Sequence, residues 1–142
     1  MSCCDIFDVF DEKNLLVKEY KHWKLLVRSK GPTLGSCVAI TQRHMERFSD
    51  ITPEEMANFQ VLVKDLETCL KSLFNYDKIN YQMLMMKDKH THFHIIPRYA
   101  MAKTFLGISW LDEGWPGLPP HSRQDLSLDT LKRVRDEIKS NL

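Results

Sequence analysis

Three histidines alternate with other residues in the stretch HTHFHIIPR, residues 90–98; they are His90, His92 and His94. Because successive side chains of a β-strand point to opposite faces, this spacing predicts three imidazoles on one face, about 6.8 Å apart along the strand. The intervening residues Thr91, Phe93 and Ile95 are then expected on the other face, directed into a core.

Three imidazoles on one face suit two kinds of chemistry. Neutral imidazole is a common ligand of zinc, but a metal site also needs further ligands, for which Asp88 and His44 are the nearest candidates. Neutral imidazole is also a nucleophile near neutral pH, and neighbouring rings can donate to phosphate oxygens and protonate a leaving group. A third interpretation is a polar strand face without a chemical role.

Apolar runs predict five strands, of which the last carries the histidines. The expected strands are Asn14–Tyr20, His22–Arg28, Ser36–Thr41, Lys78–Met86 and Thr91–Arg98. The first three are closely connected, with a turn at 31–35, so they are expected to form an antiparallel meander. A short link at Lys87-Asp88-Lys89 joins the last two.

One long helix is predicted between the third and fourth strands. Thr52 can cap its start, Pro53 suits the first helical position, and Glu55 completes a capping box. Apolar residues then recur at helical spacing as far as Phe74; they are Met56, Phe59, Val63, Leu66 and Leu70.

The remaining chain is less regular. A C-terminal amphipathic helix is expected at 127–140, whereas 100–124 has no period and carries Trp110 and Trp115, whose expected role is packing. The order of elements predicts an α+β fold, a five-stranded antiparallel sheet with one long helix packed on it and a C-terminal helix. Residues 1–142 are expected to form a single domain with its core at about 14–99.

Composition excludes several classes of partner. The 20 basic and 19 acidic residues nearly balance, which gives no electrostatic reason to expect a nucleic-acid partner. No apolar run approaches the roughly 18 residues needed to cross a bilayer, and no secretory signal is evident, so a cytoplasmic protein without membrane contact is expected. The four cysteines, at positions 3, 4, 37 and 69, lack zinc or redox spacing and predict free thiols, with Cys37 and Cys69 in the core.

The triad with its two following apolar residues resembles the signature of the histidine-triad, or HIT, superfamily of nucleotide hydrolases and transferases. Pro97-Arg98 is similar to the branch that contains the diadenosine polyphosphate hydrolases. The resemblance extends over roughly residues 14–99, through the segment 23–38 and the helix entry at 49–55.

The resemblance implies a mechanism and a dimer. His92 would attack the α-phosphorus and form a covalent nucleotidyl-histidine, which water then hydrolyses to a nucleoside monophosphate. His94 would bind the phosphate, and His90 would orient the site and assist the leaving group. A histidine at position 94 is typical of the hydrolases, because the uridylyltransferase branch carries glutamine there. No metal is required, any Mg²⁺ would arrive with a polyphosphate substrate, and two copies would pair as a homodimer with a continuous sheet.

Several positions depart from the family pattern. Ser36 stands where many relatives have a fourth histidine, and Arg28 where they have an asparagine or aspartate that contacts the ribose. The loop before the triad is shorter and lacks the Gly-Gln-Ser/Thr segment, so Lys87 or Lys89 is a candidate replacement for lost phosphate contacts. Arg98 is expected either to clamp a phosphate or to pair with a local carboxylate.

Two rival functions remain open. The altered positions suggest a nucleotide-binding or scaffold protein with weak or no catalysis. The same histidines suggest a metal-dependent hydrolase.

Overall fold

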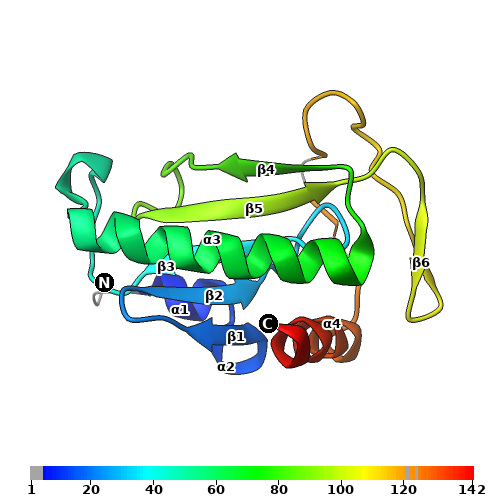
Figure 1. Ribbon diagram of the computed structural model, residues 1–142, viewed down its shortest axis with the longest axis horizontal. Helices are drawn as coiled ribbons and strands as arrows, with labels where there is room; N and C mark the ends of the chain where they lie inside the picture. Colours follow the sequence, from blue (N-terminus) through cyan, green and yellow to red (C-terminus); the bar gives the residue numbers. More distant parts are fainter. Residues whose placement is uncertain (1–4, 121, 124) are drawn as a thin grey trace.

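A five-stranded antiparallel sheet with the order β1-β2-β3-β5-β4 forms the centre of the computed structural model, which describes residues 5–120, 122–123 and 125–142 (Figure 1). Its strands are β1 (Leu16–Glu19), β2 (Trp23–Val27), β3 (Cys37–Thr41), β4 (Lys78–Gln82) and β5 (His92–Arg98). A separate two-stranded sheet pairs β6 (Lys103–Phe105) with β7 (Ile108–Trp110). The predicted α+β fold is therefore confirmed.

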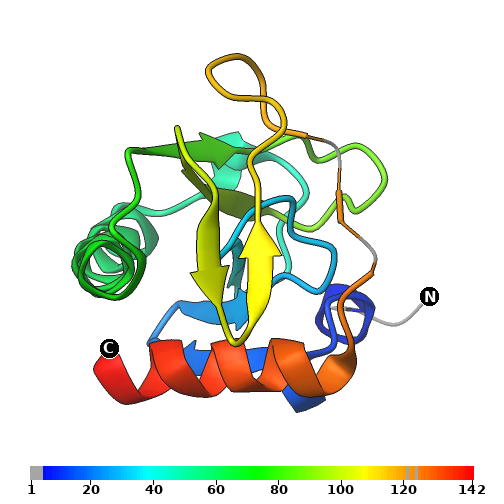
Figure 2. The same ribbon diagram turned by 90° about the vertical axis from the view of Figure 1, so that its right-hand side faces the viewer.

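Helices cover both faces of the central sheet. The helical segments are α1 (Ile6–Val9), α2 (Glu12–Leu15), the 3₁₀ turn η1 (Phe48–Asp50), α3 (Pro53–Phe74) and α4 (Leu128–Asn141). Figure 2 shows α3 and α1 on opposite sides of the sheet. Within the described ranges, none of these helices combines the length and the apolarity that crossing a bilayer needs.

The long helix α3 starts as its sequence predicts. The Thr52 side chain accepts a hydrogen bond from the Glu55 amide at 3.1 Å, and the Glu55 carboxylate accepts one from the Thr52 amide at 2.9 Å. This reciprocal pair satisfies amides that would otherwise lack helical partners. Asn75, in the left-handed conformation with φ 48°, ends the helix. Met56, expected on the apolar face, is instead 41% exposed.

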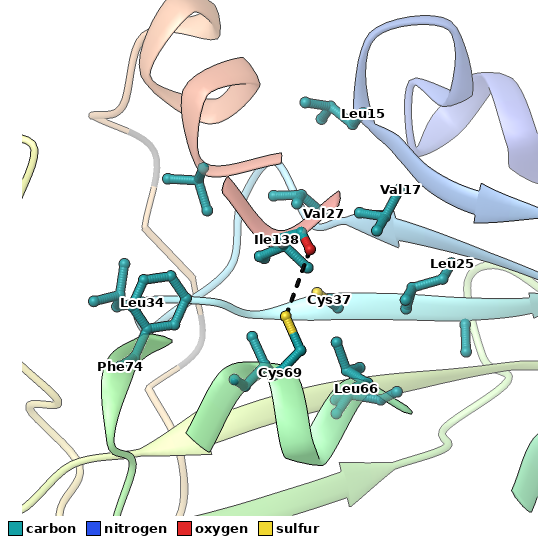
Figure 3. Packing of buried hydrophobic residues seen from close by; sticks show 14 of the residues in the cluster. Leu15, Val17, Leu25, Val27, Leu34, Cys37, Leu66, Cys69, Phe74 and Ile138 are labelled. Atoms are coloured by element: carbon teal, nitrogen blue, oxygen red, sulfur yellow. Dashed lines mark hydrogen bonds between the residues drawn. The ribbon is translucent and has the colours of Figure 1, made fainter. Parts of the chain in front are cut away.

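The main core lies between the sheet and the pair α3 and α4 (Figure 3). Fully buried side chains from β1, β2, β3 and both helices meet there, among them Leu25, Leu66 and Ile138. Each such side chain contributes about 2 kcal/mol to the free energy of unfolding. Cys37 and Cys69 are buried free thiols, as predicted, and the Cys69 thiol donates to the Ile138 carbonyl at 3.5 Å. Cys3 and Cys4 lie outside the described residues.

A smaller apolar cluster lies on the opposite face of the sheet. Ile6 and Phe10, from α1 and its end, pack against Leu26, Val38 and Ile40 of β2 and β3. This cluster fixes the N-terminal segment over the sheet face that also carries the histidines.

Four segments also differ from their expected secondary structure. The first strand is shorter than 14–20, because 12–15 forms α2 after Asp11 takes a left-handed conformation at φ 58°. The fourth strand ends at Gln82 rather than Met86, because Met85 has φ 51° and breaks the extended chain. The segment 100–124, expected to be irregular, contains β6 and β7, while residues 121 and 124 lie outside the described part. The helix α1 was not expected.

Two glycines with positive φ provide a test of the turn before β3. Gly35 has φ 83°, and a Cβ there would lie 3.1 Å from the Phe74 ring, whereas Gly107 has φ 71° and a Cβ there would meet nothing within 4 Å. We expect Gly107→Ala to lower the free energy of unfolding by about 1 kcal/mol, from backbone strain alone. Gly35→Ala adds overpacking and is expected to cost about 2–4 kcal/mol in total. Urea denaturation of both variants measures the difference, and equal costs would contradict the contact with Phe74.

Candidate active site

Strand β5 has two chemically different faces. Ile95 is buried in the main core, and Phe93 stacks on Phe59 of α3 with ring centroids 4.8 Å apart. His92 and His94 therefore point to the other face, and their rings meet edge to face at 5.1 Å. The alternation expected from the sequence is present in this strand.

His90 is positioned differently from the other two histidines. It precedes β5, which begins at His92, instead of lying within the strand. Its Nε2 lies 2.7 Å from the Thr41 carbonyl and 3.0 Å from the Thr41 hydroxyl. Because a carbonyl only accepts, Nε2 carries the hydrogen. The Nδ1 atom is buried and has no hydrogen-bond partner in the described chain. Burial lowers the pKa of His90 below its usual value.

A backbone contact fixes the tautomer of His92. Its Nδ1 lies 2.7 Å from the His90 carbonyl oxygen, so Nδ1 donates and Nε2 keeps its lone pair. The side chain is 3% exposed. The ring is thus held in one orientation with its nucleophilic nitrogen on the side away from the backbone.

His94 is held in a neutral form. Burial, followed by the nearby charges of Arg28 and His92, lowers the pKa of His94 to about 3. Its Nδ1 is buried and lacks a hydrogen-bond partner among the residues that the structure places. A ring that is neutral and incompletely paired, next to a cation, is suited to receive an anion.

Aromatic residues near the N-terminus cover the histidines. Phe10 lies 5.6 Å from the His92 ring and 5.8 Å from the His94 ring, and Phe7 lies 5.7 Å from the His90 ring, between ring centroids. Sequence reasoning missed both phenylalanines. The cluster of apolar residues at positions 6, 7, 9 and 10 before a charged stretch was the available signal, but a helix of four residues gives no period to detect.

Arg28 directly follows β2, and Ser36 directly precedes β3. The Arg28 amide donates a hydrogen bond to the Ser36 carbonyl at 3.0 Å. Arg28 is half-buried, and burial lowers the pKa of its guanidinium. The Ser36 hydroxyl lies 3.2 Å from the Thr33 amide and 3.0 Å from the Thr33 hydroxyl. Ser36 therefore closes the turn with its side chain, while the charge of Arg28 acts on His94.

Arg98 lies in the second of its two expected arrangements. It forms a bidentate pair with Asp112, with distances of 2.6 and 3.2 Å, and donates to the Asn80 side chain at 2.8 Å. Both members of the ion pair are buried. In this structure the guanidinium ties the segment after β7 to the sheet, and its donors are engaged by the protein. Arg98 and Asp112 are 14 residues apart, a separation without a period that would identify Asp112 as the partner from the sequence.

The remaining candidates lie at the edge of the site. Lys87 and Lys89 are exposed, and the described residues include no side-chain contact from either lysine to the histidines. His44 lies 5.0 Å from the His90 ring and 2.8 Å from the Glu46 carboxylate. No three histidine, cysteine or acidic side chains converge as metal ligands within residues 5–120, 122–123 and 125–142.

Comparison with known proteins places this geometry in a family. A family model described as the HIT domain matches residues 11–101. An uncharacterized HIT-like protein of Methanocaldococcus jannaschii is 37% identical over 76 residues, which are 51% of this chain and 56% of that protein. The chain thus matches little more than half the length of this relative.

Solved structures share the fold at low sequence identity. A histidine triad protein of Sinorhizobium meliloti has a TM-score of 0.73 at 16% identity, covering 95% of this chain and 94% of its own. The Plasmodium falciparum diadenosine triphosphate hydrolase, in complex with Cyclomarin A, has a TM-score of 0.67 at 18% identity, covering 90% and 76%. A zinc-bound histidine triad family protein of Mycobacterium smegmatis also has a TM-score of 0.67, at 16% identity, covering 99% and 95%.

The depressed pKa of His94 predicts sensitivity to acid. An unfolded histidine takes up a proton below pH about 6.5, whereas His94 in the folded protein stays neutral until about pH 3. The free energy of unfolding therefore falls as the pH decreases through this range. Because the ring is partly open to solvent, the slope from this residue is expected to be below about 1.4 kcal/mol per pH unit. Urea denaturation from pH 7 to pH 4 should show a smaller loss for His94→Gln than for the wild type. Parallel curves would contradict the assignment.

Proposed function

Since the chain belongs to the HIT domain family, we propose that it is a nucleotide hydrolase that cleaves a phosphoanhydride or phosphoramidate at the α-phosphate, with His92 as the nucleophile. The contact from the His92 Nδ1 to the His90 carbonyl at 2.7 Å carries the proposal, because it leaves the Nε2 lone pair for attack. Diadenosine polyphosphates are the substrate class that we propose to test first, and the cytoplasm is the proposed location.

The proposed reaction has two steps. The His92 Nε2 attacks the α-phosphorus and forms a P–N bond while the bond to the leaving group breaks, and the leaving group takes up a proton. Water then attacks the same phosphorus, the P–N bond breaks, and a nucleoside monophosphate and free His92 result.

The two neighbouring histidines support these steps in different ways. His94, which is neutral, is proposed to donate to a phosphate oxygen as negative charge builds up there. His90 is proposed to orient His92 through its backbone carbonyl and to assist the leaving group. The chain's own imidazoles supply the nucleophile without a metal, and any Mg²⁺ is proposed to accompany a polyphosphate substrate.

Replacement of the nucleophile tests the mechanism. His92→Asn is expected to lower the hydrolysis rate of an adenosine phosphoramidate or a diadenosine polyphosphate by about 10⁴-fold or more, because no covalent intermediate can form. Intact-protein mass spectrometry of the acid-quenched wild type should detect a nucleotidyl adduct that the variant lacks. His22→Asn, at the turn between β1 and β2, is the matched control and should keep the wild-type rate.

Two results would contradict the mechanism. One is hydrolysis that persists in His92→Asn. The other is phosphoramidate hydrolysis by the wild type that a chelator abolishes and zinc restores, which would favour the metal-dependent alternative. Nucleotide binding without turnover by the wild type would instead favour the scaffold alternative.

We also propose that two copies pair through the open edge of β4. Among the described strands, β4 pairs only with β5, and Tyr81 on it is exposed. The neighbouring flank of α3 exposes Met56 and Val61, which a partner would cover. Sedimentation velocity at micromolar concentration should give twice the chain mass of 16.7 kDa. A monomer throughout that range would contradict the pairing.

A further inference from the structure

Arg28 lies on the same sheet face as the histidines, at its far end. On β2, Leu26 packs on the face under α1, whereas Leu25 and Val27 belong to the main core. Arg28 follows Leu26 by two residues and so shares its face. Leu26 pairs with Val38, which pairs with His94. Leu26, Val38 and His94 therefore lie side by side across the sheet, and Arg28 lies two residues further along the chain on the same face.

The Arg28 guanidinium is a cation without a counter-ion in the described part of the chain. It is half-buried, and burial is the cause that lowers its pKa. In residues 5–120, 122–123 and 125–142, no carboxylate or carbonyl receives a hydrogen bond or ion pair from this guanidinium. Every other arginine that the structure buries as deeply is paired, as Arg98 is with Asp112. Partly buried cations normally have such a partner, because desolvation of an unpaired charge is costly.

The surroundings of Arg28 favour a bound anionic ligand as its partner, in place of a carboxylate of the protein. The charges that act on the neighbouring His94 come from Arg28 and His92, and both disfavour its protonation. The Nδ1 of this neighbouring His94 likewise has no hydrogen-bond partner among the described residues. The Arg28 guanidinium therefore has donors that no described acceptor receives, and the oxygens of a phosphate supply such acceptors.

Arg28 is too far from the nucleophile to serve the same phosphate. Lys24 and Ile40 lie in register with His92, so Arg28 is four residues further along and two strands across. These steps amount to about 16 Å between the Cα atoms of Arg28 and His92. Side chains of neighbouring strands stand roughly perpendicular to the sheet and not along it, so the guanidinium and the His92 ring remain well apart. A phosphorus bonded to the His92 Nε2 and a group bound to the guanidinium are then separate parts of one ligand.

We propose that Arg28 forms a second phosphate subsite, so that the substrate is a nucleotide with a further phosphate set apart from the one that His92 attacks. This inference rests on the proposed function. The further phosphate belongs either to a ribose hydroxyl or to a distal position of a polyphosphate chain, and both present the same oxygens to a bidentate guanidinium.

Ligand binding to the His92→Asn protein tests the subsite, because this variant leaves the ligand intact. Titration calorimetry compares adenosine 5′-monophosphate with adenosine 3′,5′-bisphosphate and with ATP. We expect at least one of the two ligands with additional phosphates to bind about 10- to 100-fold more tightly than the monophosphate, as charge-assisted hydrogen bonds allow. A gain with the bisphosphate alone identifies a ribose phosphate, and a gain with ATP alone identifies the chain.

Substitution of Arg28 assigns the gain to this residue. Arg28→Gln in the same background should remove most of the gain and change the affinity for the monophosphate far less. Lys30→Gln is the matched control, because this exposed lysine lies two residues further on and carries the same charge; it should keep the gain. If Arg28→Gln does not fold, Arg28→Lys, which keeps the charge without the planar fork, should retain a smaller gain.

The outcomes separate this inference from the proposed function. Equal affinity for all three ligands, or a gain that survives substitution of Arg28, overturns the second subsite alone. An equal loss for monophosphate and bisphosphate in Arg28→Gln also overturns it, because Arg28 would then serve the attacked phosphate. A wild type that prefers the bisphosphate but hydrolyses no nucleotide overturns only the hydrolase. Failure of every nucleotide to bind overturns both.

Discussion

The site depends on a strand that must satisfy two environments at once. β5 lies between β3 and β4, and the face that carries Ile95 and Phe93 packs into the core beneath α3. A shift of one residue would exchange these side chains with His92 and His94 and place imidazoles in that core. The cost of burying unpaired rings therefore fixes the register of β5. The same register brings the His90 carbonyl to the His92 Nδ1, so core packing selects the tautomer of His92.

Burial and a neighbouring positive charge determine the electrostatics of the site. The described groups around His92 and His94 are imidazoles, an arginine and aromatic rings, and the depressed pKa of His94 reflects burial beside Arg28. Such a site stores unfavourable energy in its ligand-free form, because a cation and an unpaired ring nitrogen are both partly removed from water. An anionic ligand would lower the cost of the desolvated cation and could pair with the free ring nitrogen. By contrast, Arg98 is fully paired with Asp112 and acts on the fold, which shows that burial of an arginine alone does not identify a ligand site.

The sequence predicted the regular parts of this arrangement because they obey local rules. The capping box at Thr52 and Glu55 and the two-residue period of β5 are each set by neighbouring residues. The missing parts depend on contacts between distant residues. A helix of four residues such as α1 has no stability of its own and exists here because Ile6 and Phe10 pack on β2 and β3. Likewise, pairing of Arg98 with Asp112 joins positions whose separation carries no period.

The N-terminal segment around α1 contacts both the apolar cluster and the histidines. Ile6 and Phe10 close the apolar cluster on the histidine side of the sheet, and Phe7 and Phe10 lie against the imidazoles themselves. One short helix thus both seals the second face of the sheet and shields His92 from water. Removal of water strengthens the hydrogen bonds within the site and contributes to the lowered pKa values of His90 and His94. The stability of that face and the chemistry of the site are therefore coupled through the same two phenylalanines, so substitutions that loosen α1 should affect both together.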